Sequence, residues 1–214
     1  MNLIDTAKYT HTKYLVVATC VSTQPSKAHL FRNYNLPNDN DSRFEGTSSS
    51  RVWQAVRASS AAPGYFDAYK EGGEIYVDGA LVANNPTFMA MYEADRIFPD
   101  SKLDLVVSLG NGLKPTKPAA NSISEFFAAL IDNATENEKT AYMLEELLPK
   151  MQVPYFRMNF ADELFDDWPL DEVRTEKFEL LDTLFANYYA ENAKKYDEIA
   201  AILLGNTQDR METS

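Results

Sequence analysis

The chain is poor in cysteine and histidine, and this scarcity excludes several classes of protein. Its 214 residues contain one cysteine, Cys20, and two histidines, His11 and His29. A single cysteine cannot form an internal disulfide, which excludes a disulfide scaffold and favours a reducing, intracellular compartment. Cys20 lies within an apolar run, residues 15–21, which predicts a buried strand thiol. No Cys/His cluster or His-Glu-x-x-His pattern indicates zinc, and we expect no metal or organic cofactor.

Long apolar runs and positive charge are also scarce. No stretch approaches the ~18 apolar residues of a membrane span, and the first 15 residues lack a signal-peptide core. The 20 Lys and Arg against 32 Asp and Glu give a formal net charge of −12. This charge argues against nucleic acid as a partner, because such binding depends on cationic contacts with phosphates. It also disfavours electrostatic docking on anionic lipid, although a local basic or apolar patch could overrule the average.

The chain also lacks the usual serine nucleophile. No Gly-x-Ser-x-Gly pattern, which presents a reactive serine on a strand-to-helix turn, occurs anywhere in the sequence. Residues 39–41 (Asp-Asn-Asp) lack the glycine and the distal glutamate of a calcium loop, so they predict a solvated loop. The 45% of hydrophobic residues are enough for a sizeable core.

What is present is an alternation of short apolar strands and helices. The predicted strands cover residues 14–21, 29–34, 75–77, 103–109 and 153–160. The predicted helices cover residues 52–61, 86–98, 122–131, 135–144 and 174–204. Helices that separate apolar strands predict an α/β fold with a mainly parallel sheet covered on both faces. If the first strand were a free edge, its apolar residues would be an aggregation hazard.

Asp78 is the strongest candidate for a functional residue. The run from Glu74 to Asp78 predicts a short strand that ends in a carboxylate, directly before a turn at Gly79. A helix is predicted after Pro86. Open α/β sheets bind ligands at the carboxyl ends of their strands, which is where this acid is placed. Taken alone, an Asp before a Gly is most often a turn residue that bonds its own backbone.

Three motifs in order resemble a known family. They are residues 52–66 (Val-Trp-Gln-Ala-Val-Arg-Ala-Ser-Ser-Ala-Ala-Pro-Gly-Tyr-Phe), Asp78-Gly79-Ala80 with Asn84-Asn85-Pro86, and residues 107–112 (Val-Ser-Leu-Gly-Asn-Gly). Together they resemble the patatin-like phospholipases, in particular the calcium-independent phospholipases A2 of the gamma type. The resemblance runs from about residue 14 to about residue 204.

The resemblance implies a fold and an activity. It implies a three-layer α/β/α fold in which residues 1–112 form the C-terminal portion of a patatin-like domain and residues 113–214 a mainly helical extension. The family hydrolyses acyl esters with a Ser–Asp dyad, without calcium, so Asp78 would be the general base in an Asp78-Gly79-Ala80 motif. The serine elbow and the oxyanion loop lie N-terminal to these motifs in the family. We therefore expect the nucleophile upstream of Met1, in a partner chain, or nowhere.

The implied substrate is a phospholipid or a related acyl ester, reached through peripheral membrane contact. The alternative, from another class, is a catalytically inactive half-domain that binds lipid or protein. An incomplete gene model is a third possibility.

Several other residues have a structural and a functional interpretation. Ser59 and Ser60 are expected to be small helix residues that allow close packing rather than nucleophiles. Residues 110–112 predict a tight turn rather than a phosphate site. Asn84 and Asn85 are expected to cap the following helix. Core positions are the favoured interpretation for Trp53, Tyr65 and Phe66, and an acyl-chain channel is the alternative for the last two.

Overall fold

The computed structural model describes residues 1–37, 42–113, 138–160, 168 and 171–212. The chain divides into two compact units, residues 1–102 with 120–140, and residues 103–119 with 141–214. The candidate acid lies in the first unit and the Gly-Asn-Gly motif in the second.

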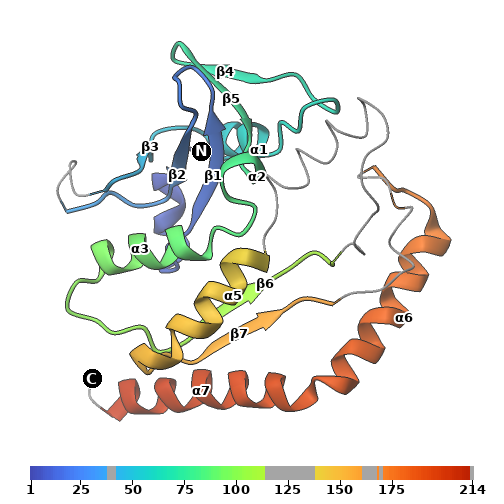
Figure 1. Ribbon diagram of the computed structural model, residues 1–214. Helices are drawn as coiled ribbons and strands as arrows, with labels where there is room; N and C mark the ends of the chain where they lie inside the picture. Colours follow the sequence, from blue (N-terminus) through green and yellow to red (C-terminus); the bar gives the residue numbers. More distant parts are fainter. Residues whose placement is uncertain (38–41, 114–137, 161–167, 169–170, 213–214) are drawn as a thin grey trace. The chain divides into compact units, whose positions relative to one another are not determined.

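The first unit is built on a five-stranded sheet with the strand order β3-β2-β1-β5-β4 (Figure 1). The central strand β1 pairs with β2 on one side and with β5 on the other, so the first strand is not a free edge. The sequence predicts these three strands but not the two short edge strands. Their bounds are β1 (Leu15–Cys20), β2 (Lys27–Arg32), β3 (Glu45–Thr47), β4 (Tyr69–Glu71) and β5 (Glu74–Asp78).

The strand directions in this sheet are mixed. The pair β2–β3 is parallel, whereas β1–β2, β1–β5 and β4–β5 are antiparallel. The β4–β5 pair is a tight hairpin: only Gly72 and Gly73 join the two strands, and both have the positive φ of a type I′ turn, 59° and 89°. The predicted α/β class is confirmed. The expectation of mainly parallel strands holds for β2–β3, and for the pair β6 (Val106–Leu109) and β7 (Tyr155–Met158), but not around β1.

One face of this sheet is covered by helix α1 (Val52–Ser59), as Figure 1 shows. Ala55 and Ala58 lie one turn apart on α1 and let the helix approach the sheet closely. Cys20 is buried, as predicted. The core cluster consists of Leu3, Ala18, Cys20, Phe31, Ala55, Ala58 and Tyr76.

The expectation that Trp53, Tyr65 and Phe66 belong to the core is wrong. Their exposed fractions are 57%, 50% and 58%. Because α1 directs Ala55 and Ala58 to the sheet, the residue two positions before each of them projects from the opposite side of the helix. Tyr65 and Phe66 follow the helix in an exposed turn.

A buried ion pair ties the other face of the sheet to helix α3 (Thr87–Ile97). Arg32 of β2 donates from Nε (2.7 Å) and Nη2 (3.0 Å) to the carboxylate of Glu93, which is fully buried. The hydroxyls of Tyr34 and Ser42 also donate to Glu93, at 3.0 and 2.6 Å. Burial acts to raise the pKa of Glu93, but the hydrogen bonds from Arg32 and Ser42 outweigh it, and the pKa is lowered.

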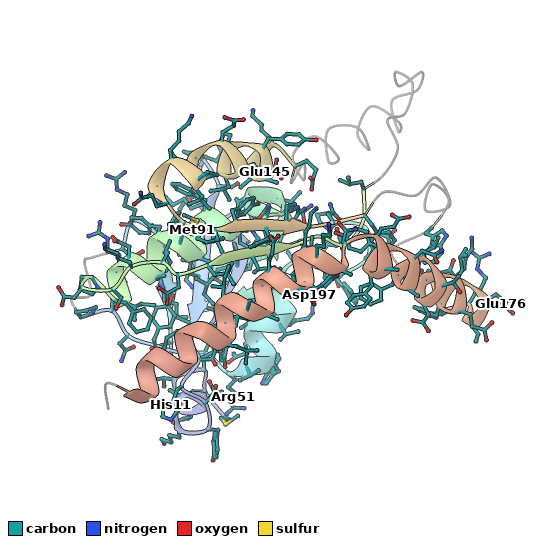
Figure 2. The ribbon with its side chains drawn as sticks, turned by 90° about the horizontal axis from the view of Figure 1, so that it is seen from below. His11, Arg51, Met91, Glu145, Glu176 and Asp197 are labelled. Atoms are coloured by element: carbon teal, nitrogen blue, oxygen red, sulfur yellow. The ribbon has the colours of Figure 1, made fainter. Side chains whose placement is uncertain are left out.

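The described residues from 103 onward are mainly helical and include a parallel strand pair. The strands β6 (Val106–Leu109) and β7 (Tyr155–Met158) pair in register from Val106 with Tyr155. The helices are α5 (Glu138–Leu147), η2 (Pro149–Met151), α6 (Thr175–Glu191) and α7 (Ala193–Glu212), and Figure 2 labels Glu176 and Asp197 on the last two. The helix expected over residues 122–131 lies outside the described residues.

The single helix predicted over residues 174–204 is two helices. Asn192 separates α6 from α7, and its side-chain Nδ2 donates to the carbonyl of Tyr188 at 2.9 Å. Asparagine side chains compete for backbone groups in this way, which ends a helix without a proline or glycine. Within the part of the chain that the structure describes, no helix has the length and apolar character to cross a bilayer.

Candidate active site

Asp78 is the last residue of β5, at the point where the strand meets the four-residue helix α2 (Ala80–Ala83). Its half-buried side chain accepts a hydrogen bond at Oδ1 from the backbone N–H of Ala80, at 2.8 Å. This is the local turn bond expected of an Asp before a Gly. It fixes the carboxylate orientation and leaves Oδ2 without a hydrogen-bond donor from the described residues.

Two backbone hydrogen bonds and one from a side chain fix the position of this turn. The N–H of Asp78 donates to the carbonyl of Ala61 (3.1 Å), and the N–H of Gly79 donates to the carbonyl of Ser59 (3.1 Å). The hydroxyl of Thr19 in β1 donates to the carbonyl of Asp78 at 2.7 Å. The acid is therefore positioned by the end of α1 and by the central strand.

These contacts explain why the first two sequence motifs occur together. The Ala-rich end of α1 provides the carbonyls that bind the Asp78-Gly79 turn. Ser60 donates its hydroxyl to the carbonyl of Val56 at 2.9 Å, as a helix residue does. The Asp78 carboxylate accepts its hydrogen bond from the N–H of Ala80 and not from Ser59 or Ser60. The role of Thr19 was not predictable, because a threonine in an apolar strand carries no signal of its own.

Position 79 requires a glycine because there is no room for a side chain, not because the backbone conformation is unusual. Its φ is −63°, in the ordinary helical region. A Cβ at this position would lie 2.1 Å from the carbonyl oxygen of Val17 and 2.8 Å from its carbon. The motif glycine is thus explained by the close approach of the turn to β1.

We expect Gly79→Ala to destabilise the fold by about 2–3 kcal/mol, because backbone atoms of β1 must move to accept the methyl group. Urea denaturation measures this change. Gly205→Ala is the matched control, since a Cβ at Gly205 in α7 meets no atom within 4 Å. That variant is expected to be neutral or slightly more stable. Equal effects of the two substitutions would contradict the packing argument.

The segment after the turn is also held by a side chain. Asn85 is buried, and its Oδ1 accepts hydrogen bonds from the N–H and the hydroxyl of Thr87, the first residue of α3. The predicted capping role is therefore seen for Asn85, whereas Asn84 is exposed. A cavity of about 200 Å³ adjoins α2 and the start of α3. Its lining residues are Phe44, Val82, Ala83, Asn84, Asn85, Phe88, Met89 and Thr140.

His29 lies on the same sheet face as Asp78 but cannot serve as its partner. Both residues pair with Ala18, from opposite sides of β1, so two strand spacings of about 10 Å in total separate them. The imidazole packs against the rings of Phe31 and Tyr76, with centroids 4.8 and 5.0 Å away. Burial, followed by the positive charge of Arg32, lowers the pKa of His29 to about 4.

We expect His29 to make the fold sensitive to acid. An unfolded histidine has a pKa of about 6.5, so between pH 6.5 and 4 the unfolded state binds more protons than the folded state. The free energy of unfolding should fall by about 3 kcal/mol across this window and lose nothing further from His29 below it.

Urea denaturation at several pH values measures this effect. His29→Phe should flatten the dependence above pH 4.5, because the buried Nε2 of His29 has no hydrogen-bond partner among the described residues. His11→Gln is the control, since His11 is exposed (Figure 2). A His29→Phe variant that keeps the full pH dependence would show that another group is responsible.

The Gly-Asn-Gly motif of residues 110–112 forms a turn in the second unit. The N–H of Gly110 donates to the carbonyl of Met158 (2.8 Å), and the N–H of Gly112 donates to Oδ1 of Asn159 (2.9 Å). A Cβ on Gly110 would lie 2.2 Å from the Asn159 side chain. These N–H groups bind residues at the end of β7, which supports a structural rather than a phosphate-binding role. Among the described residues, no cluster of His, Cys, Asp and Glu could hold a metal ion.

The fold and the Asp78 turn define an α/β protein with a carboxylate at the end of a sheet strand. Residues 4–91 match the family model described as Patatin-like phospholipase. The chain is 37% identical over 207 residues to the calcium-independent phospholipase A2-gamma of Homo sapiens, a match that covers 94% of this chain and 26% of that protein. The resemblance inferred from the sequence motifs is thereby confirmed.

Two further relatives bear other phospholipase names. The chain is 35% identical over 193 residues to phospholipase A I of Arabidopsis thaliana, covering 75% of this chain and 15% of that protein. It is 30% identical over 232 residues to the 85/88 kDa calcium-independent phospholipase A2 of Mus musculus, covering 90% and 28%. The chain thus spans between 15% and 28% of the length of these three relatives.

Proposed function

We propose that this chain supplies the aspartate base of a calcium-independent lipid acyl hydrolase that works with a Ser–Asp dyad. The observation that carries the proposal is the Asp78 carboxylate at the end of β5, oriented through Oδ1 and open at Oδ2, within the motif that matches the family. The proposed substrate is a phospholipid or a related acyl ester, in line with the names of the relatives.

The proposed chemistry needs a serine that this chain does not contain in an elbow motif. The serine Oγ attacks the ester carbonyl while its proton passes to the Asp78 carboxylate. The tetrahedral intermediate collapses, and the leaving alcohol takes that proton from Asp78. Asp78 then accepts a proton from water as the water attacks the acyl-enzyme, and the serine leaves with that proton as the fatty acid is released.

The proposed contribution of the chain is scaffold as well as base. Residues 1–112 would provide the C-terminal portion of the catalytic domain, and residues 113–214 a mainly helical extension. The serine-bearing segment would come from sequence upstream or from a partner chain. The complete enzyme would work inside the cell, in peripheral contact with membranes.

The second candidate is a non-catalytic module that binds lipid or protein. It is favoured by the absence of Gly-x-Ser-x-Gly from all 214 residues. The two candidate functions can be distinguished by joining a serine-bearing family segment ahead of residue 1, or by supplying it in trans, and then measuring turnover. Release of fatty acid from phosphatidylcholine supports the hydrolase, and binding without turnover supports the module.

A further inference from the structure

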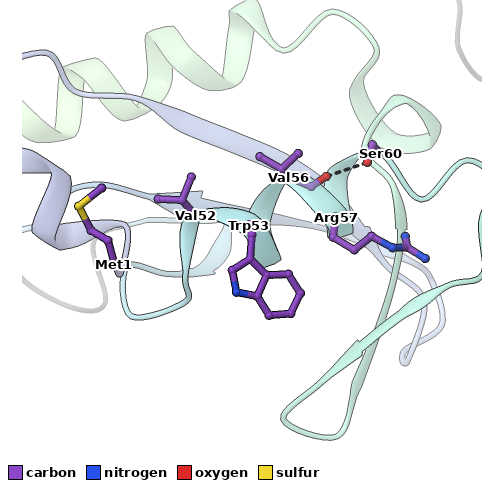
Figure 3. A pocket seen from close by; sticks show the side chains of 6 residues that line it. All are labelled: Met1, Val52, Trp53, Val56, Arg57 and Ser60. Atoms are coloured by element: carbon purple, nitrogen blue, oxygen red, sulfur yellow. Dashed lines mark hydrogen bonds between the residues drawn. The ribbon is translucent and has the colours of Figure 1, made fainter.

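The outward side of α1 forms an apolar groove close to the candidate acid. This α1 groove has a volume of about 590 Å³, and Figure 3 shows its lining residues, Met1, Val52, Trp53, Val56, Arg57 and Ser60. The exposed fractions of Trp53 and Val56 are 57% and 56%. Phe66 extends this surface, because the Arg57 guanidinium lies over its ring at 5.3 Å. Tryptophan and phenylalanine exposed together on one surface indicate a binding face.

The charge of this surface differs from that of the rest of the chain. Between Gly46 and Phe66 the sequence contains Arg51 and Arg57 and no Asp or Glu, although the whole chain has a formal net charge of −12. Arg57 donates from Nη2 to the carbonyl of Asp67 at 2.7 Å, while its Nη1 is buried with no acceptor among the described residues. A phosphate oxygen is a strong acceptor for a guanidinium, and the half-buried Arg57 side chain must turn outward to meet one.

The same helix leads directly to the candidate active site. The carbonyls of Ser59 and Ala61, at the end of α1, accept the hydrogen bonds of Gly79 and Asp78. A membrane that contacts Trp53 and Val56 would therefore lie within a few helical turns of the Asp78 carboxylate. Aromatic rings beside a cation, next to an esterase site, suit the interfacial region of a bilayer.

We propose that the α1 groove is the surface by which the protein docks on a zwitterionic phospholipid bilayer. Trp53, Val56 and Phe66 enter the interfacial region, and Arg57 turns toward a lipid phosphate. The zwitterionic preference follows from the acidic remainder of the chain, which anionic lipid repels. This inference rests on the proposed function, since it gives the lipid hydrolase a route to its substrate.

The test uses the full 214-residue chain and extruded phosphatidylcholine vesicles. The chain has two tryptophans, so Trp168→Phe leaves Trp53 as the sole reporter. Its emission should shift to shorter wavelength on vesicle addition and be quenched by brominated phosphatidylcholine. In vesicle flotation, Trp53→Ala should weaken partitioning about tenfold, the effect of losing one buried aromatic side chain. Vesicles containing phosphatidylserine should bind less protein.

Two further variants secure the interpretation. Val56→Ser weakens partitioning a few fold, and it keeps the fold because Val56 is exposed. Phe98→Ala is the matched control: Phe98 is also an exposed aromatic residue (47%), but it ends α3, which Glu93 ties to the other face of the sheet. It should bind as wild type does. Each variant must unfold at the same urea concentration as the parent chain.

The outcomes that overturn the proposal are distinct from those that overturn the proposed function. Unchanged Trp53 emission, or equal partitioning of Trp53→Ala and wild type, removes the docking surface. The proposal also fails if Trp53 emission shifts only when a serine-bearing segment is added, because the groove is then a protein interface. Asp78→Asn should bind vesicles as wild type does. Vesicle binding without turnover in the serine-restored protein therefore rejects the hydrolase and keeps the surface.

Discussion

Asp78→Asn is expected to lower ester turnover by about a thousandfold to ten-thousandfold in a protein that also carries the serine-bearing segment. An amide cannot accept the serine proton, so both acylation and release of the acyl group lose their base. The substitution keeps the Oδ1 acceptor for the Ala80 N–H, which preserves the turn. Fatty acid release from a short-chain phosphatidylcholine, measured under single-turnover conditions, gives the rate.

The matched control for this substitution is Asp95→Asn. Asp95 lies in α3 and is exposed, so it shares the chemistry of the change but not the position. We expect its turnover to match the parent protein. If Asp78→Asn keeps more than about a tenth of the parent rate while its unfolding transition is unchanged, Asp78 is not the base.

The second large effect concerns stability. Glu93→Gln should lower the free energy of unfolding by about 3–5 kcal/mol, because it leaves the Arg32 guanidinium buried without its counter-ion. The side chains of Arg32 and Glu93 are only 7% and 0% exposed, so water cannot replace the lost carboxylate. Urea denaturation at neutral pH measures the change, because the carboxylate of lowered pKa is fully ionised there.

An exposed ion pair between strands of the same sheet provides the comparison. Lys27 and Glu45 lie 2.7 Å apart, with side chains 48% and 59% exposed. Glu45→Gln should cost at most about 1 kcal/mol. The double variant Arg32→Met with Glu93→Leu should recover much of the loss, since well-packed apolar groups often replace a buried pair. A small effect of Glu93→Gln alone would contradict the argument that Arg32 depends on this carboxylate.

The order of motifs made much of the candidate site predictable. β5, the Asp78-Gly79 turn and the helix after Pro86 each have a strong local signal, and the structure places α3 over Thr87–Ile97. The reason for the alanine-rich motif at the end of α1 was not visible in the sequence. Its carbonyls bind a turn nearly twenty residues further on, and backbone contacts leave no side-chain signature.

Other features depend on contacts between distant residues. Arg32 and Glu93 are 61 residues apart, and neither is recognisable as a buried charge from its neighbours in sequence. The edge strands β3 and β4 are three residues each, too short for a periodic pattern, although Gly72-Gly73 is a hairpin signal that could have revealed β4. Trp53 was predicted to be buried because an aromatic residue in a short helix usually belongs to the core. The sequence does not show which face of the helix is buried, and Trp53 lies on the exposed one.

The central claim is that Asp78 activates a serine, and labelling of that serine by a fluorophosphonate tests it most directly. The probe reacts with an activated hydroxyl and needs neither a membrane nor a lipid substrate, so it is independent of docking. In the serine-restored protein we predict rapid labelling of the elbow serine, at least about a hundredfold slower in Asp78→Asn. Labelling at the same rate in both proteins would contradict the account.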